Sequence, residues 1–398
     1  MEKLFQIIKF GILLSAACTT EHALCAQEGN ASAPLPCAAR MRTPPPSEFC
    51  PRVLKFAAEN AIAPQLQMQF CLAAAMLGFP NFDGAAQNSP VRITFEKERA
   101  FAEVLAEKDS EFQNRLAQFA APTFGNGNGK YRIVAIPLKG APVPAQCLRP
   151  LPQLSAEEIS AMPLIDAVIA PETLAEFLDA HTMGFLAHSA EKSLKNTRAK
   201  LRLLRKSAEI TARADFANGA ELLAKTPSKD LAELLPETPQ KAVSTFRFAK
   251  PAQIDFSKAG AKLPKVSATG AFVLARVGAV EDGFAAVFEV APDGGDFRGE
   301  TRGAYFAKKS SLLAVATEEQ TLENILRKID SARLPTPSGQ KLTLKISAAA
   351  ATATLEIAPV IGASGRVEAL EAKAEIPAAL LKAAVEKFAQ NGGANGKN

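Results

Sequence analysis

A strict alternation of apolar and polar residues from Ser207 to Asp215 constrains the fold of this chain more than any other feature. Successive side chains of a β-strand point to opposite faces, so this alternation predicts a strand with one buried face. Asn218-Gly219 follows, and this pair favours the type I′ turn that joins two antiparallel strands. We therefore expect residues 220–226 to return as the second strand of a hairpin.

The same two-residue period recurs along the chain, mostly in its second half. It predicts strands at 91–95, 131–138, 164–170, 243–248, 271–277, 284–290, 303–307, 312–316, 342–347, 353–357 and 370–376. Apolar residues at three- and four-residue spacing indicate helices instead. We predict these at 53–77, 97–119, 155–161, 171–187, 188–206, 317–329 and 377–390.

This mixture of elements predicts an α+β fold made of two related modules, each with a mainly antiparallel sheet covered by helices. Two stretches of similar sequence occur in the same order in the two modules. Residues 91–105 align with 312–326, and further along residues 168–174 align with 374–380. The shared order predicts an internal duplication. The alternative is that strand-to-helix junctions resemble one another by chemistry alone.

Hydrophobic residues make up 47% of the chain and charged residues 22%, which excludes a mainly disordered protein. Prolines crowd the stretch before residue 49, and prolines at 236 and 239 mark a second break. We therefore divide the chain into a signal peptide at 1–26, a Pro-rich linker at 27–48, a first α+β module at 49–240, a second at 241–390 and a flexible tail at 391–398.

The first 26 residues have the order of a secretory signal. Two lysines precede a short apolar run at 10–17, and small residues allow cleavage near Ala26. The run is shorter than the roughly 20 residues that span a bilayer. The pattern predicts export to the periplasm or the cell surface of a bacterium. Leu14-Ser-Ala-Ala-Cys18 also resembles a lipobox, which predicts a lipoprotein with Cys18 lipidated as the alternative.

Cleavage at that point leaves four of the six cysteines, an even number suited to disulfides in an oxidising compartment. A bridge between Cys37 and Cys50 closes a short loop beside the linker, so we favour it over a bridge to Cys147. For Cys71, burial as a small apolar side chain is the alternative. No cysteine or histidine spacing typical of zinc occurs.

The sequence contains few of the residue patterns that catalytic sites use. Beyond the signal only His181 and His188 remain, and their spacing is not that of a helical zinc motif. The Gly-rich stretch 125–130 precedes a strand, whereas phosphate-binding loops precede a helix. Residues 293–296 supply too few oxygen ligands for calcium. We therefore expect no catalytic residue, no cofactor and no metal, although paired carboxylates far apart in sequence would leave no such pattern.

Residues 188–206 form the most basic segment, and leucines at helical spacing predict an amphipathic helix there. Such helices bind acidic proteins or lie on anionic lipid, so this one is a candidate partner-binding face. A solvated outer face of a packed helix is the alternative. Residues 188–206 lack the aromatic residues that stack nucleic-acid bases. The residues of this face are Lys192, Lys195, Arg198, Arg202 and Arg205.

These features together predict an exported, non-catalytic protein with a binding or envelope-structural role. Its partner would be an unknown protein or envelope component, with peripheral membrane contact open and nucleic acid disfavoured. The net charge of +5 is too small to indicate a partner by itself. An exported hydrolase with an unrecognised carboxylate or serine site is the alternative function.

Overall fold

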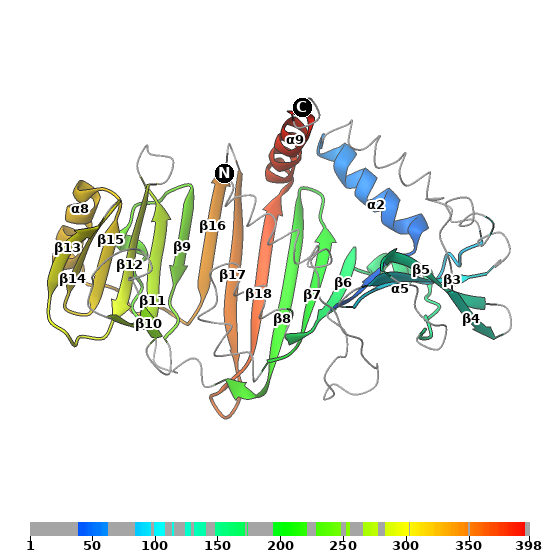
Figure 1. Cartoon of the computed structure of the whole chain (residues 1–398), viewed down its shortest axis with the longest axis horizontal. Coiled ribbons are helices and arrows are strands. Elements are labelled where there is room, and N and C mark those ends of the chain that lie inside the picture. Colours follow the sequence, from blue (N-terminus) through cyan, green and yellow to red (C-terminus); the bar gives the residue numbers. More distant parts are fainter. Residues whose placement is uncertain are drawn as a thin grey trace. The chain divides into compact units, whose positions relative to one another are not determined.

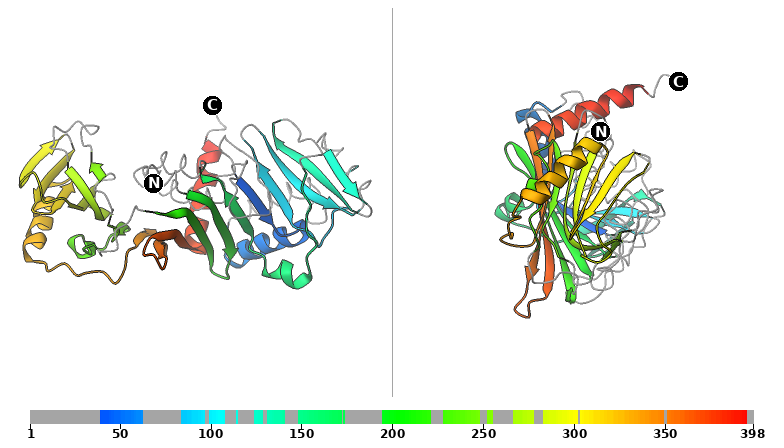
Figure 2. Two further views of the ribbon diagram at one scale, coloured as in Figure 1. Left: turned by 90° about the horizontal axis from the view of Figure 1, so that it is seen from below. Right: turned by 90° about the vertical axis from the view of Figure 1, so that its left-hand side faces the viewer.

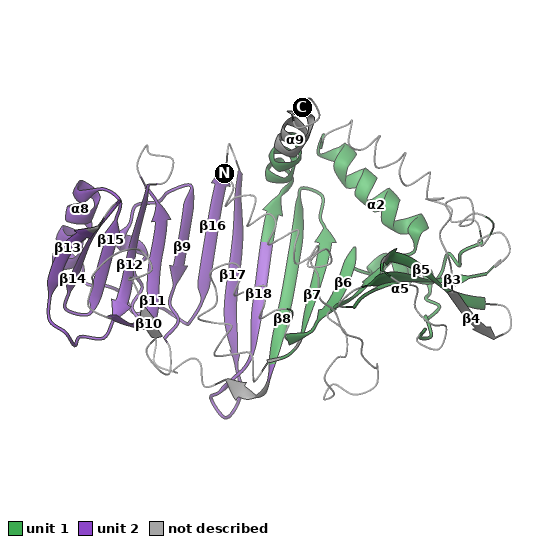
Figure 3. Cartoon of the chain, in the orientation of Figure 1, with its two compact units in different colours: residues 1–215, 375–398 green, residues 216–374 purple. Residues whose placement is uncertain are grey.

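The computed structural model describes residues 39–62, 84–96, 99–107, 114, 124–128, 131–140, 148–171, 173, 194–220, 228–247, 252–254, 266–277, 283–301, 303–348 and 351–394. Antiparallel strands dominate this part of the chain (Figure 1). It divides into two compact units (Figure 3). Unit 1 comprises residues 1–215 and 375–398, and unit 2 comprises residues 216–374.

Unit 1 is built on antiparallel strands in the order β4-β5-β3-β2-β1-β6-β7. Their bounds are β1 Ala39–Thr43, β2 Val91–Phe95, β3 Ala100–Ala106, β4 Phe124–Asn128, β5 Tyr131–Lys139, β6 Ile165–Ile169 and β7 Leu194–Leu203. A tight turn joins β7 to β8 (Ser207–Ala220), closed by a hydrogen bond from Leu204 N to Ser207 O of 2.8 Å. Strand β8 continues beyond unit 1 at its far end.

Helices α2 (Pro46–Glu59), α5 (Ala156–Ala161) and α9 (Ala378–Ala394) accompany the strands of unit 1. Buried Phe56 of α2 and Ala378 of α9 share an apolar cluster with Leu203 at the end of β7. Arg52 of α2 donates to the carbonyl oxygens of Ile159 and Met162 at 2.7 and 2.9 Å. A cation there satisfies carbonyls that a helix end leaves without partners, so Arg52 ties α2 to α5.

Unit 2 is a second antiparallel series, in the order β13-β14-β15-β12-β11-β9-β16-β17. The short β10 (Ala252–Ile254) pairs with the first residues of β11. The strand bounds are β9 Gln240–Ser244, β11 Val266–Arg276, β12 Phe284–Val290, β13 Phe297–Thr301, β14 Ala304–Lys309, β15 Leu312–Ala316, β16 Leu342–Ala348, β17 Ala351–Ile361 and, at the C-terminal end, β18 Val367–Pro377.

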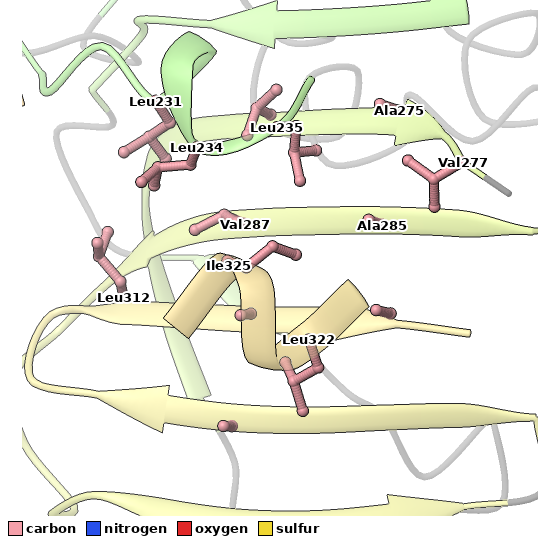
Figure 4. Close-up of a cluster of buried hydrophobic side chains, with 14 of the residues drawn as sticks. Leu231, Leu234, Leu235, Ala275, Val277, Ala285, Val287, Leu312, Leu322 and Ile325 are labelled. Atoms are coloured by element: carbon pink, nitrogen blue, oxygen red, sulfur yellow. The ribbon is translucent and has the colours of Figure 1, made fainter. Parts of the chain in front are cut away.

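The largest buried cluster lies between one face of these strands and two short helical segments, α8 (Glu319–Ser331) and η2 (Ala232–Leu234). Figure 2 shows α8 lying along one side of the unit 2 strands. Leu322 and Ile325 of α8 belong to this cluster together with Val287 of the sheet (Figure 4). Removal of this apolar surface from water is the main force that holds α8 and η2 to the sheet.

The expectation of an α+β fold with helix-covered sheets is wrong. The described chain consists mostly of antiparallel sheet and contains a few short helices. The predicted helix at 97–119 contains strand β3, and the predicted helix at 188–206 contains strand β7. The predicted turn at Asn218-Gly219 lies within β8, which runs on to Ala220.

The alignment that suggested an internal duplication also fails. It pairs residues 97–105, most of which form strand β3, with residues 318–326, most of which form helix α8. The preceding strands differ in their neighbours as well: β2 lies between β1 and β3, whereas β15 lies between β12 and β14. Similar residues at a strand end therefore lead into different structures.

Candidate functional site

Strand β7 presents its basic residues on one face. Thr197 and Ala199 are only 3% and 4% exposed, whereas Arg198, Lys200 and Arg202 between and beyond them are exposed. This alternation is that of a half-buried strand, in which every second side chain points to the same face. The three cations therefore form a line with a spacing of roughly 6.6 Å along the strand. We call Arg198, Lys200 and Arg202 the basic face.

The predicted partner-binding face is thus rearranged. Arg198 and Arg202 are brought together, and Lys200 joins them although the helical interpretation had left it out. Lys195 is exposed near the start of β7, and Arg205 is exposed in the turn that follows. Lys192 lies outside the described residues. The signal for the correct face is present in the sequence, because Ala199, Leu201 and Leu203 alternate with the cations.

A row of charged residues crosses the sheet from the basic face. Lys200 lies opposite Asp166 of β6, which lies opposite Arg42 of β1. Arg42 Nη2 lies 3.0 Å from Asp166 Oδ2, so this carboxylate is held by an arginine. Directly opposed residues share a face of the sheet, so Arg42 and Asp166 flank the basic face on its own side.

The same row ends in a buried ion pair. Arg92 of β2 lies opposite Glu103 of β3, and their side chains are 1% and 2% exposed with Nη1 and Oε1 3.4 Å apart. The segment that follows Leu148 closes over them: Pro150 O accepts from Arg92 Nη2 at 2.9 Å, and Arg149 N donates to Glu103 Oε1 at 3.1 Å. The row is therefore neutralised at its buried end.

The basic face differs from this end because its three cations are exposed and because Asp166, which lies opposite Lys200, pairs with Arg42. Within the described part of the chain, Arg198, Lys200 and Arg202 form no ion pair. Several cations elsewhere in the described chain do have a carboxylate partner. The paired ones include Arg42, Arg52, Arg92, Arg213, Lys241, Arg298 and Lys341.

The end of β7 is held in place from two sides. Asn60 at the end of α2 donates from Nδ2 to Arg205 O at 3.1 Å. Ala378 N at the start of α9 donates to Lys206 O at 2.9 Å. Ser207 Oγ lies 3.0 Å from Glu375 Oε1. Both carbonyls of the turn are satisfied by helices, so the strand that carries the basic face ends in a fixed turn.

The turn at residues 292–296 is not arranged for a metal ion. Lys308 of β14 is buried and donates from Nζ to Pro292 O and Gly295 O at 3.4 and 3.0 Å. An ammonium group therefore occupies the carbonyl oxygens that a cation would need. Asp296 Oδ1 accepts from Ser310 N at 2.6 Å. No group of three or more His, Cys, Asp and Glu side chains that could hold a metal occurs in the described ranges.

Several predicted features fall on other parts of the chain. Cys50 is buried in α2, but Cys37, Cys71 and Cys147 lie outside the described residues, so the disulfide stays a prediction. Cys18, His181 and His188 lie outside them too. None of the helices in the described ranges is long and apolar enough to cross a membrane.

Comparison with known proteins gives no family for this chain. No protein-family model matches it. No curated protein and no solved structure matches it either. A function for this chain therefore has to rest on its own residues and their geometry.

Proposed function

We propose that this protein is an exported, non-catalytic binding protein that holds an acidic component of the cell envelope on the basic face. The observation that supports it is the exposure of Arg198, Lys200 and Arg202 on one side of a strand, where they form no ion pair in the described chain and the opposed Asp166 is already held by Arg42. Clustered cations of this kind raise the local concentration of anions and speed their association.

Side chains would make the contacts. Strand β7 lies between β6 and β8, so its backbone groups are used within the sheet and an added strand cannot pair with it. The buried partners Thr197 and Ala199 fix the strand from behind, which holds the cations in one direction. Binding would therefore depend on charge, and salt should weaken it strongly.

The predicted export supports the choice of an envelope partner. The signal pattern of residues 1–26 predicts a mature chain that begins near Ala26 or Gln27, where acidic lipids and polymers of the cell surface are accessible. N-terminal sequencing of the protein recovered from an envelope fraction would test this step. Retention of Met1 on cytoplasmic protein would contradict it.

The binding step can be tested with vesicles of phosphatidylglycerol and, separately, with an immobilised sulfated polysaccharide. The triple variant Arg198→Ser, Lys200→Ser, Arg202→Ser should lose binding at least about tenfold, since each exposed cation near an anionic surface contributes about 1 kcal/mol. The matched control replaces three exposed cations elsewhere, Lys55, Arg333 and Lys345, with serine. The control should bind like the natural chain.

Two results would overturn the proposal. One is equal binding by the triple variant and the natural chain on both probes. The other is reproducible turnover of an ester, glycoside, peptide or phosphate substrate that one acidic or serine substitution abolishes, which would favour the hydrolase instead.

A further inference from the structure

Strand β13 forms an edge of the unit 2 sheet. It pairs with β14 from Phe297 opposite Lys308 to Thr301 opposite Ala304, and no other described strand pairs with it. Figure 1 shows β13 at the outer end of the unit 2 strands, beside β14. An edge strand presents unpaired N–H and C=O groups that another strand can use.

The turn at the end of β13 determines which groups these are. Thr301 and Ala304 are the last opposed pair, two residues separate them, and Gly303 has φ 93°. In hairpins with connections of this length, the pair that closes the turn is hydrogen-bonded. In an antiparallel pair the hydrogen-bonded residues alternate with residues whose backbone groups point outward. Thr301 belongs to a hydrogen-bonded pair, so the backbone N–H and C=O groups of Glu300 and of every second residue before it point away from β14. The residues of β13 with such outward backbone groups are Arg298 and Glu300.

The sequence of this edge is complementary to itself. Two copies of β13 related by a two-fold axis can pair with Arg298, Gly299 or Glu300 at the centre. Centring on either charged residue places like charges opposite each other, which destabilises a pair. Centring on Gly299 places Arg298 opposite Glu300 of the second copy, twice by symmetry. This register also joins the outward backbone groups of both copies.

The side chains are placed for this register. Arg298 donates from Nη2 to Glu319 Oε1 at 2.9 Å and from Nη1 to Glu323 Oε1 at 2.6 Å, on the side of the sheet that α8 covers. A guanidinium group has five N–H donors, so donors remain for a further carboxylate. Glu300 lies on the same face as Arg298, is exposed and has no ion pair with a described residue.

Gly299 leaves room at the centre. On the opposite face the ring of Phe306 lies over it, so closely that an added Cβ would be 2.6 Å from Cζ of that ring. At a central pair that exchanges no hydrogen bonds, Cα atoms approach to about 4.5 Å. A glycine at this position has no side chain that would keep a second copy away.

We propose that β13 pairs with β13 of a second copy of this chain, in the antiparallel register centred on Gly299. The interface is isologous, so the same residues contribute from both copies and the assembly stops at a dimer. The pairing is short and solvent-exposed, so the dimer is expected to be weak and to form with rising protein concentration.

The test uses two charge variants of the full chain, studied by sedimentation equilibrium up to about 1 mM. In Glu300→Lys, a lysine meets Arg298 of the second copy; in Arg298→Glu, a glutamate meets Glu300. Each variant alone should dimerise at least about tenfold more weakly than the natural chain. An equal mixture of the two should restore dimers, because both opposed pairs are again opposite in charge only in the mixed dimer.

Glu233→Lys is the control, since it makes the same charge change at an exposed position of η2. It should dimerise like the natural chain. Arg298→Glu also loses the contacts with Glu319 and Glu323, so its thermal unfolding is measured in parallel, and Glu300→Lys carries the test if that variant unfolds. A natural chain that stays monomeric to about 1 mM, or a dimer unchanged in Glu300→Lys, would overturn the proposal.

Discussion

Lys241 and Glu237 form an ion pair between a buried ammonium and an exposed carboxylate. Lys241 Nζ lies 3.1 Å from Glu237 Oε1, and the two side chains are 4% and 72% exposed. The same Nζ donates to Ala232 O at 2.8 Å and to Leu235 O at 3.1 Å. Strand β9 thus satisfies the carbonyls at the end of η2, and two buried carbonyls and one exposed carboxylate compensate the charge of Lys241.

Replacing Lys241 should destabilise unit 2. Lys241→Met keeps the length of the side chain but leaves the carbonyls of Ala232 and Leu235 without their donor. We expect the free energy of unfolding to fall by about 1–3 kcal/mol, the cost of an unsatisfied buried polar group. Urea unfolding followed by circular dichroism measures it. Glu237→Gln is the comparison and should change stability far less, because its carboxylate is exposed.

The carboxylate of this pair gives a small pH dependence. The hydrogen bond from Lys241, and then its positive charge, lower the pKa of Glu237 below its ordinary value of 4.5. A lowered pKa means that the stabilisation is present above the ordinary value and is lost as pH falls through the lowered one. The difference in stability between the natural chain and Glu237→Gln should therefore shrink below pH 4.5.

A background without Lys241 provides the control for this pH effect. In Lys241→Met, adding Glu237→Gln should produce a much smaller pH-dependent difference, since the donor is absent and only the charge of Lys345 still lowers the pKa of Glu237. Stability curves at several pH values measure both comparisons. A pH-dependent difference of equal size in the two backgrounds would mean that another group lowers the pKa of Glu237.

The buried pair of Arg92 and Glu103 should be sensitive to the loss of either member. Glu103→Leu leaves a buried guanidinium without its carboxylate, and we expect a loss of about 3–5 kcal/mol in the free energy of unfolding. The double variant Arg92→Met, Glu103→Leu removes both charges and should recover part of that loss. Recovery would be incomplete because Arg149 N and Pro150 O lose their partners. A double variant less stable than both single variants would contradict this account.

Gly270 is required at a close approach of two main chains. The pairing of β11 with β12 shifts between Ala268 and Phe272, and Gly270 in this bulge has φ 133°. An added Cβ would lie 2.3 Å from Phe246 O. Gly270→Ala should therefore destabilise the protein by at least about 1–3 kcal/mol, the usual cost of a strained backbone, measured by thermal unfolding.

Gly339→Ala is the control for this substitution. Gly339 has no positive φ, and an added Cβ would meet no atom within 4 Å. Its replacement should leave stability nearly unchanged or raise it slightly through the unfolded state. Equal effects of the two alanine substitutions would exclude steric contact with Phe246 as the cause.

Strands with an alternating or a wholly apolar sequence were predictable from the sequence. The predicted strands at 91–95, 284–290 and 312–316 have the bounds of β2, β12 and β15, and the helix predicted at 317–329 differs by two residues from α8. These elements show a clear two-residue alternation, buried apolar runs, or apolar residues at helical spacing on one face. Local pattern and burial agree there, so the prediction is confirmed.

Strand β3 was not predictable in this way. All of its residues are buried, Glu103 included, so its sequence shows neither an alternation of faces nor the wholly apolar run that marks β15. Ala, Glu and Leu are good helix formers, and pairing with β2 and β5 overrides that preference. The buried pair of Arg92 and Glu103 depends on this pairing and was missed for the same reason.

The basic face itself gives the last prediction, because a strand and a helix place neighbouring residues differently. In β7, Ala199 is buried beside Met41 and Ala167, whereas the next residue, Lys200, is exposed. Ala199→Asp buries a carboxylate in an apolar cluster and should cost about 3 kcal/mol or more, or prevent folding. Lys200→Asp places a carboxylate on the exposed face opposite Asp166 and should cost only about 0.2–1 kcal/mol.

The comparison keeps the charge introduced the same and moves it by a single residue. Thermal unfolding of the two variants and the natural chain is the measurement, and Lys200→Asp should in addition weaken binding to phosphatidylglycerol vesicles if the basic face binds anions. On an exposed helical face, Ala199 and Lys200 would both tolerate aspartate. Equal tolerance of the two substitutions would show that this segment does not alternate as a strand, and the basic face would then not exist as a line of cations.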